Sequence, residues 1–189
     1  MRTNSTPRGS PRIRLISSFA MLVLVIGGVS FYSIRKTDEL FDIGVNDHVH
    51  CALAGQTQKA EMAAGLGNRF APMLQPVLAA AGTDYAAVSD QRCNVDGRAC
   101  VQIVLRRGQT PVSLILTSRG DQEVFPRALA GRVVLAAGIR LHEGSRDGYS
   151  VAAFESGAYL GYIVSALPGQ QNGELAARVA PVIDRYTKP

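Results

Sequence analysis

The tetrapeptide His-Val-His-Cys at 48–51 brings three metal-capable side chains into four positions. Imidazole nitrogens and thiolates are ligands that zinc, copper and haem iron accept in proteins. In a strand His48 and His50 would share one face, and in a helix His48 and Cys51 would do so. Either arrangement supplies two ligands, whereas a closed structural zinc site needs four. One hypothesis is therefore a zinc, copper, haem or redox site at His48, His50 and Cys51, completed by Cys93 or His142.

The same tetrapeptide also has a purely structural interpretation. Asp47 would cap the start of a helix, the two histidines would lie at an interface, and Cys51 would be a buried thiol. The rest of the sequence lacks the common catalytic motifs, including G-x-S-x-G, H-E-x-x-H, the phosphate-binding loop and C-x-x-C. The glycines at 65 and 67 lack the third glycine of a dinucleotide fingerprint. We therefore expect a protein that is not an enzyme.

The sequence contains three cysteines, an odd number. Asp96-Gly97 is a strong two-residue hairpin signal, and as the turn it would pair Cys93 directly with Cys100 across the ladder. The prediction is a Cys93–Cys100 disulfide that leaves Cys51 as the odd thiol. A three-residue loop would make those cysteines diagonal neighbours. A Cys51–Cys93 disulfide and three free thiols remain the alternatives, because disulfide geometry cannot be read from spacing.

The charge distribution points away from nucleic acid. The chain of 189 residues has a formal net charge of +5, but four of its twenty Lys and Arg residues lie before residue 15. The remaining sixteen nearly balance the fifteen acids, and 6% aromatic content without Trp offers few surfaces on which bases could stack. No basic footprint for a phosphate backbone is present in the part that folds.

The segment 15–34 indicates a membrane anchor. It contains twenty residues without a charge, enough for a helix that spans a bilayer of roughly 30 Å. A cleaved signal peptide is the alternative, with Gly28 and Ser30 as small residues before a cleavage site. The apolar run continues through Phe31 and Tyr32 to a basic stop at 35–36, which favours an uncleaved anchor. The Arg-rich segment 1–14 would be a disordered cytoplasmic tail, and the domain beyond the anchor would be in the periplasm.

The elements beyond the anchor indicate an α+β domain over 48–189, preceded by a polar juxtamembrane linker at 35–47. Helices are predicted over 55–66, over 70–81 with Gly82 at its end, and at the C-terminus, where Leu175, Val179 and Ile183 share a face. Alternating apolar residues predict strands at 101–105 and 112–116, joined by a turn at 107–110. Weaker strands are expected at 132–136 and 139–143. The predicted domain is an antiparallel β-meander flanked by helices.

A second hairpin is predicted over 149–167. If Ser156-Gly157 forms its two-residue turn, Phe154 lies opposite Tyr159 and Val151 opposite Tyr162.

The segment 149–181 resembles the final module of the extracytoplasmic domains of bacterial membrane-bound anti-sigma factors and related transmembrane regulators. The shared pattern is a strand with an aromatic residue, a tight turn, a Y-x-x-Y-I-V-S strand at 159–165 and a Leu/Ala-rich helix. The segments DHVHCAL at 47–53 and RCNVDGRACVQIVLRRGQTPVSLILT at 92–117 are similar to exported domains that follow the anchors of such regulators. The resemblance covers about 100 residues.

The resemblance implies a non-enzymatic sensor or protein-interaction module of an envelope regulatory system, with another envelope protein as its partner. Its location would be the inner membrane, crossed once, with the N-terminus in the cytoplasm. Such regulators carry a sigma-binding domain before the anchor, whereas fourteen residues precede Leu15 here. We therefore expect a detached sensor half or a partner of such a regulator.

Overall fold

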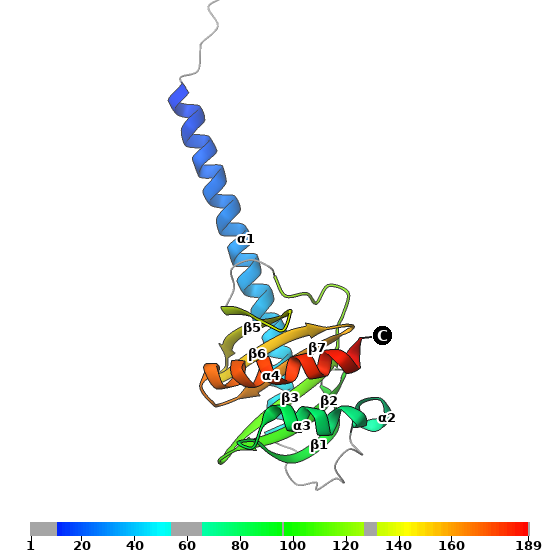
Figure 1. Ribbon diagram of the computed structural model, residues 1–189. Coiled ribbons are helices and arrows are strands. Elements are labelled where there is room, and N and C mark those ends of the chain that lie inside the picture. The colour runs from blue at the N-terminus through cyan, green and yellow to red at the C-terminus, as the bar shows by residue number, and fades with distance from the viewer. Residues whose placement is uncertain (1–10, 54–65, 96, 127–131, 189) are drawn as a thin grey trace, which may run out of the picture.

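The computed structural model describes residues 11–53, 66–95, 97–126 and 132–188. A seven-stranded antiparallel sheet has helices on both faces, which confirms the predicted α+β class (Figure 1). The helical elements are α1 (Pro11–Asp47), η1 (His48–Leu53), α2 (Gly67–Phe70), η2 (Ala71–Met73), α3 (Leu74–Ala81) and α4 (Gly169–Thr187). The strands are β1 (Ala86–Val95), β2 (Arg98–Arg107), β3 (Thr110–Ser118), β4 (Arg132–Ala136), β5 (Ile139–Arg146), β6 (Tyr149–Ser156) and β7 (Tyr159–Ser165).

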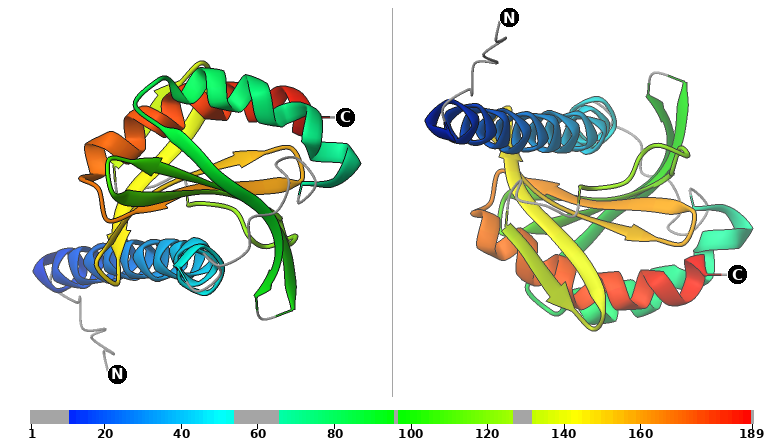
Figure 2. Two further views of the ribbon diagram at one scale, coloured as in Figure 1. Left: turned by 90° about the horizontal axis from the view of Figure 1, so that it is seen from below. Right: turned by 90° about the horizontal axis from the view of Figure 1, so that it is seen from above.

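The strand order is β1-β2-β3-β7-β6-β5-β4. The sheet therefore contains two meanders, β1 to β3 and β4 to β7, joined where β3 pairs with β7, instead of the single meander that was predicted. The helices α3 and α4 cover one face of the sheet, and the last part of α1 crosses the other (Figure 2). The site described below lies on the α1 face.

Helix α1 has 37 residues and a length of about 55 Å. Its last part packs on the sheet because Thr37, Leu40, Phe41, Gly44 and Val45 recur at helical spacing and are all buried. Gly44 is needed there, since an added Cβ would lie 2.8 Å from a ring carbon of Tyr162. The segment 35–47, predicted to be a linker, is therefore a helix that belongs to the core of the domain.

The earlier part of α1 extends away from the sheet (Figure 1). Its described apolar side chains are exposed, namely those of Met21, Val25, Ile26, Val29, Phe31, Tyr32 and Ile34. None of the helices in the described ranges meets the length and hydropathy required to cross a membrane.

The hairpins of the first meander match their predictions. Cys93 lies opposite Cys100 and Val95 opposite Arg98, and Gly97 has the positive φ of +79° that this tight turn requires. In the next hairpin Ile103 lies opposite Leu114. Strands are also present at both of the weaker candidates, 132–136 and 139–143.

The register predicted for the second hairpin is wrong. Phe154 lies opposite Gly161, not Tyr159, and Val151 lies opposite Val164, not Tyr162. The turn is one residue later, at Gly157-Ala158, because Gly157 adopts a φ of +58° there. This register lets the Phe154 ring pack over the bare Cα of Gly161.

The helices that flank the sheet follow the predicted pattern with small changes. The helix predicted over 70–81 is divided at Pro72 into α2, η2 and α3, and Gly82 ends it with a φ of +85°. Helix α4 buries the predicted face, including Leu175, Val179 and Ile183. The helix predicted over 55–66 lies outside the described residues, apart from Leu66.

Candidate functional site

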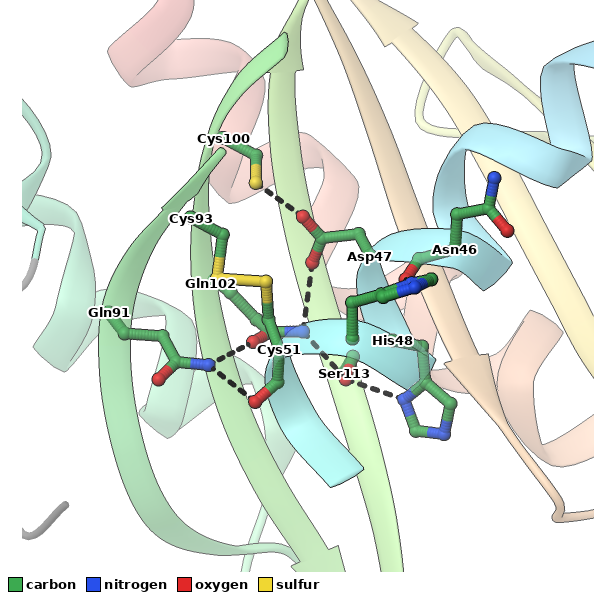
Figure 3. Close-up of a disulfide and its surroundings, with 10 residues drawn as sticks. Asn46, Asp47, His48, Cys51, Gln91, Cys93, Cys100, Gln102 and Ser113 are labelled. Carbon is green, nitrogen blue, oxygen red and sulfur yellow. Dashed lines mark hydrogen bonds between the residues drawn. A yellow bond between two sulfur atoms is a disulfide. The ribbon is translucent and has the colours of Figure 1, made fainter. Parts of the chain in front are cut away.

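The candidate site forms where α1 ends and η1 begins. The six residues of η1 form a π-helix directly after Asp47, so the chain turns onto the sheet without leaving a helical path. Asp47, His48 and Cys51 thereby face polar side chains of β1, β2 and β3 (Figure 3). The central residues of β2 and β3 are otherwise apolar, and Gln102 and Ser113 are fully buried among them.

A disulfide joins Cys51 of η1 to Cys93 of β1 (Figure 3), with their Cα atoms 6.4 Å apart. The predicted Cys93–Cys100 disulfide is therefore wrong, although the register that was expected for these two cysteines is right. The physical reason is the packing of α1, which brings η1 over β1 so that Cys51 reaches the sulfur of Cys93. Cys100 is the free thiol and is buried.

The Cys100 thiol donates a hydrogen bond to Oδ2 of Asp47. The other oxygen, Oδ1, accepts a hydrogen bond of 3.0 Å from the Gln102 side-chain amide. One oxygen of Asp47 also lies within 4.8 Å of the sulfurs of Cys51 and Cys93. Asp47 thus accepts a hydrogen bond from one cysteine and lies close to the other two.

The amide of Gln102 extends this network across the sheet. Its Nε2 donates to Oγ of Ser113 at 3.1 Å, and Nε2 of Gln91 donates to its Oε1 at 2.7 Å. The same Nε2 of Gln91 also donates to the backbone carbonyl of Cys51 at 3.0 Å. Ser113 Oγ shares a hydrogen bond of 2.7 Å with Nδ1 of His48. Because each of these groups is bonded, the buried polar cluster fixes how η1 sits on the sheet.

Burial controls the protonation of this cluster. It raises the pKa of Asp47 to about 6, against the lowering effects of the Cys100 hydrogen bond and the charge of His50. Burial also raises the pKa of the Cys100 thiol far above its usual range, and the hydrogen bond and charge of Asp47 raise it further. The pKa of His48 falls to about 4 for the same reason, so this imidazole is neutral at pH 7.

The predicted metal ligands do not converge. His48 is buried against Ser113 and the edge of Tyr149, whereas His50 is exposed and bonds to the backbone carbonyl of Asn46. The sulfur of Cys51 is in the disulfide. His142, considered as a distant ligand, stacks on Phe125 instead.

Asp47, Cys51 and Cys93 do have ligand atoms close enough for a metal ion. Two of these three residues are joined in the disulfide and offer no thiolate, which is the form of cysteine that binds metal. Asp47 also does not cap a helix, because its carboxylate binds Cys100 and Gln102 instead. The chemistry that the arrangement supports is that of a thiol beside a disulfide.

A cavity of about 280 Å³ opens beside this cluster. Cys100 and Asp47 form part of its wall, together with Asn46, Arg98 and Thr117. The guanidinium of Arg98 forms an ion pair with Glu123. The cavity gives solvent and small reagents a route to the buried thiol.

Sequence reasoning overlooked Asp47, Gln102 and Ser113 as members of a site. The available signal was the presence of Gln102 and Ser113 on strands whose other central residues are apolar. A search against protein-family models and a search of curated proteins both found no match.

Proposed function

We propose that this protein is anchored in the inner membrane by its N-terminal helix and that its C-terminal domain is a sensor or protein-interaction module in the periplasm. The observation that carries the proposal is the continuity of α1. The exposed apolar side chains between Met21 and Ile34 belong to the same helix whose later residues, Leu40, Phe41 and Val45, are buried on the sheet. A continuous helix of this kind would couple the domain mechanically to the membrane around its apolar part.

Two further features support the proposed location. The uncharged run at 15–34 has four Arg residues before it, whereas the two basic residues after it are soon followed by acids, and this asymmetry favours a cytoplasmic N-terminus. Disulfides such as Cys51–Cys93 form and persist in oxidising compartments. Both features agree with a domain exported across the inner membrane.

The role as a regulatory module follows from the resemblance of 149–181 to the ectodomains of anti-sigma factors and related regulators. In this proposal the domain is not an enzyme, and its partner is another envelope protein. The rival proposal is an exported redox-active or metal-binding protein. The disulfide beside the Cys100 thiol favours the redox form of that rival over the metal form.

Protease treatment of spheroplasts tests the topology. Protease should remove the domain and leave a short fragment in the membrane, and the same protease should have no effect on intact cells. An intact, soluble periplasmic protein that begins after Ser30 would instead identify a cleaved signal peptide.

Metal analysis and a visible absorption spectrum of the full chain in detergent distinguish a sensor from a metalloprotein. We expect no stoichiometric metal and no visible absorption band. Stoichiometric zinc, copper or haem that is lost in His48→Ala would overturn the proposal.

Deletion of 48–189 with the anchor retained tests the regulatory role. This deletion should change the transcription of envelope genes under stress, and an unchanged transcriptome would contradict the regulatory role.

A further inference from the structure

Cys93 has two cysteine neighbours on the α1 face of the sheet. It is bonded to Cys51, with the Cα atoms 6.4 Å apart, and it lies directly opposite Cys100 in the β1–β2 ladder. Directly opposed residues of an antiparallel pair have Cα atoms about 4.5 to 5.5 Å apart and side chains on the same face. Disulfides accept Cα separations of about 4.4 to 6.8 Å. Both partners of Cys93 therefore satisfy the geometric requirement, and only one of them is bonded at a time.

We propose that Cys51, Cys93 and Cys100 form a thiol–disulfide exchange site, in which Cys100 replaces Cys51 as the partner of Cys93 and Asp47 restrains the exchange by binding the Cys100 thiol. The proposal stands on the ladder register, the Cys51–Cys93 bond and the hydrogen bond from Cys100 to Asp47.

The exchange is an isomerisation without net oxidation or reduction. Cys100 loses its proton to water, and its thiolate attacks Sγ of Cys93. A Cys93–Cys100 bond forms while the Cys51–Cys93 bond breaks, and the electron pair leaves on the sulfur of Cys51. This thiolate then takes up a proton from water, so that no proton is gained or lost overall. No external oxidant or reductant is needed.

Asp47 sets the rate because the thiolate is the attacking species. The carboxylate accepts the thiol hydrogen bond and places a negative charge beside the sulfur, and both effects keep Cys100 protonated. The other charged group that acts on this thiol is Arg98 on the same strand, and Glu123 pairs with it. From η1, the exposed His50 acts on Asp47. The exchange is thus slow while α1 holds Asp47 against β2.

The exchange would release a covalent clamp. In the observed state the disulfide ties η1 to β1. After the exchange, η1 would be held by noncovalent contacts such as those of His48 with Ser113 and of the Cys51 carbonyl with Gln91. The cross-strand bond would lie entirely within the β1–β2 hairpin. The end of α1 could then move relative to the sheet.

This inference deepens the sensor part of the proposed function, because it names the thiol–disulfide state of the domain as the signal. It does not depend on the anchor. The topology experiment can contradict the proposed anchor while the exchange is still observed, and the exchange can be absent while the topology is confirmed. The two proposals are therefore tested separately.

Tryptic mapping of the oxidised full chain in detergent micelles tests the exchange. Trypsin separates the three cysteines, because Cys51 lies in the peptide 37–59, Cys93 in 93–98 and Cys100 in 99–106. The protein is incubated with N-ethylmaleimide at pH values from about 7 to 10, across the thiol range. It is then quenched in acid, digested and analysed by mass spectrometry without reduction.

The expected product carries the alkyl group on Cys51 and links 93–98 to 99–106. Its rate of formation should rise about tenfold per pH unit, because the thiolate fraction does so below the thiol pKa. It should not depend on protein concentration. A product alkylated on Cys100 with the Cys51–Cys93 link intact would overturn the proposal, as would the absence of the 93–98 to 99–106 link at every pH. Cys100→Ser should give no alkylation of Cys51.

Asp47→Asn tests the restraint. A lower thiol pKa raises the thiolate fraction more than it reduces nucleophilicity, so the exchange should become at least about threefold faster. Asp38→Asn is the matched control, because Asp38 is on the same helix but faces Arg146, and its rate should equal that of the natural chain. A slower or unchanged rate in Asp47→Asn would overturn the role of Asp47.

Cys51→Ser tests the geometry without any exchange. With oxidised glutathione as the oxidant, this variant should form the Cys93–Cys100 disulfide. Mixed disulfides with glutathione that persist without a link between 93–98 and 99–106 would overturn the proposal.

Discussion

His142 stacks on Phe125, with the ring centroids 4.4 Å apart, and its Nδ1 has no hydrogen-bond partner among the described residues. Burial, followed by the charge of Arg140, lowers its pKa from 6.5 to about 4. Between these values the unfolded chain binds a proton that the folded chain does not. The contribution of His142 to stability is therefore complete above pH 6.5 and is lost as the pH falls toward 4.

His142→Phe keeps the stacked ring and removes the titration. We expect the natural chain to lose up to about 3 kcal/mol more unfolding free energy than the variant between pH 7 and pH 4. Urea unfolding followed by tyrosine fluorescence measures this difference, since the chain has no Trp. His48 and Asp47 titrate in both proteins and cancel. Parallel pH profiles would contradict the neutral, buried state of His142.

Tyr162 is fully buried, and its hydroxyl finds no hydrogen-bond partner within the described ranges. Tyr162→Phe removes a polar group that folding desolvates without compensation, so the free energy of unfolding should rise by about 1 kcal/mol. Tyr159→Phe, at a partly buried position, is the control and should change little. A loss of stability in Tyr162→Phe would show that the hydroxyl is hydrogen-bonded.

The second hairpin requires a glycine at position 161, because any side chain there would collide with Phe154. A Cβ on Gly161 would lie 2.3 Å from Cζ of Phe154, directly across the ladder. Gly161→Ala should therefore cost about 1 to 3 kcal/mol, because the buried ring must move in a packed core. Thermal unfolding measures the loss. Gly169→Ala is the control, since its new Cβ would meet only the Ser150 hydroxyl, at 3.8 Å. Equal stability of the two variants would show that the Phe154 ring can move freely.

Helix α1 is held on the sheet by its apolar stripe and by polar contacts at its edge. Arg146 of β5 donates two hydrogen bonds to the carboxylate of Asp42, at 2.6 and 3.1 Å. Both side chains are more than a third exposed, so this pair adds little stability beside the burial of Leu40, Phe41 and Val45. The pair nevertheless links α1 to β5 close to Asp47.

At the scale of the whole molecule, the disulfide closes a loop between residues separated by 42 positions. Loop-closure entropy assigns such a bond a stabilisation of about 4 kcal/mol. Cys93→Ser removes both pairings of Cys93 and should lower the free energy of unfolding by about that amount in urea. Cys51→Ser, once oxidised, should recover about 2.5 kcal/mol from the short Cys93–Cys100 loop. Equal losses in the two variants would contradict the second pairing.

The parts of this protein that the sequence by itself determined are local. Alternation predicted strands β2 and β3, Asp96-Gly97 favoured the opposition of Cys93 and Cys100 over a diagonal arrangement, and helical periodicity predicted α4. In each case the deciding interactions join residues close in sequence, so the pattern and the turn chemistry carry the information.

Only the tertiary structure decided which residues meet across the chain. Helix α1 crosses the sheet, so a segment that reads as a polar linker becomes part of the core and η1 comes to lie over β1. Cys51 therefore bonds Cys93, and Asp47 meets Cys100 from 53 positions away. The register of the second hairpin likewise follows from where Gly161 admits the Phe154 ring. These contacts depend on packing between distant segments, which no local pattern encodes.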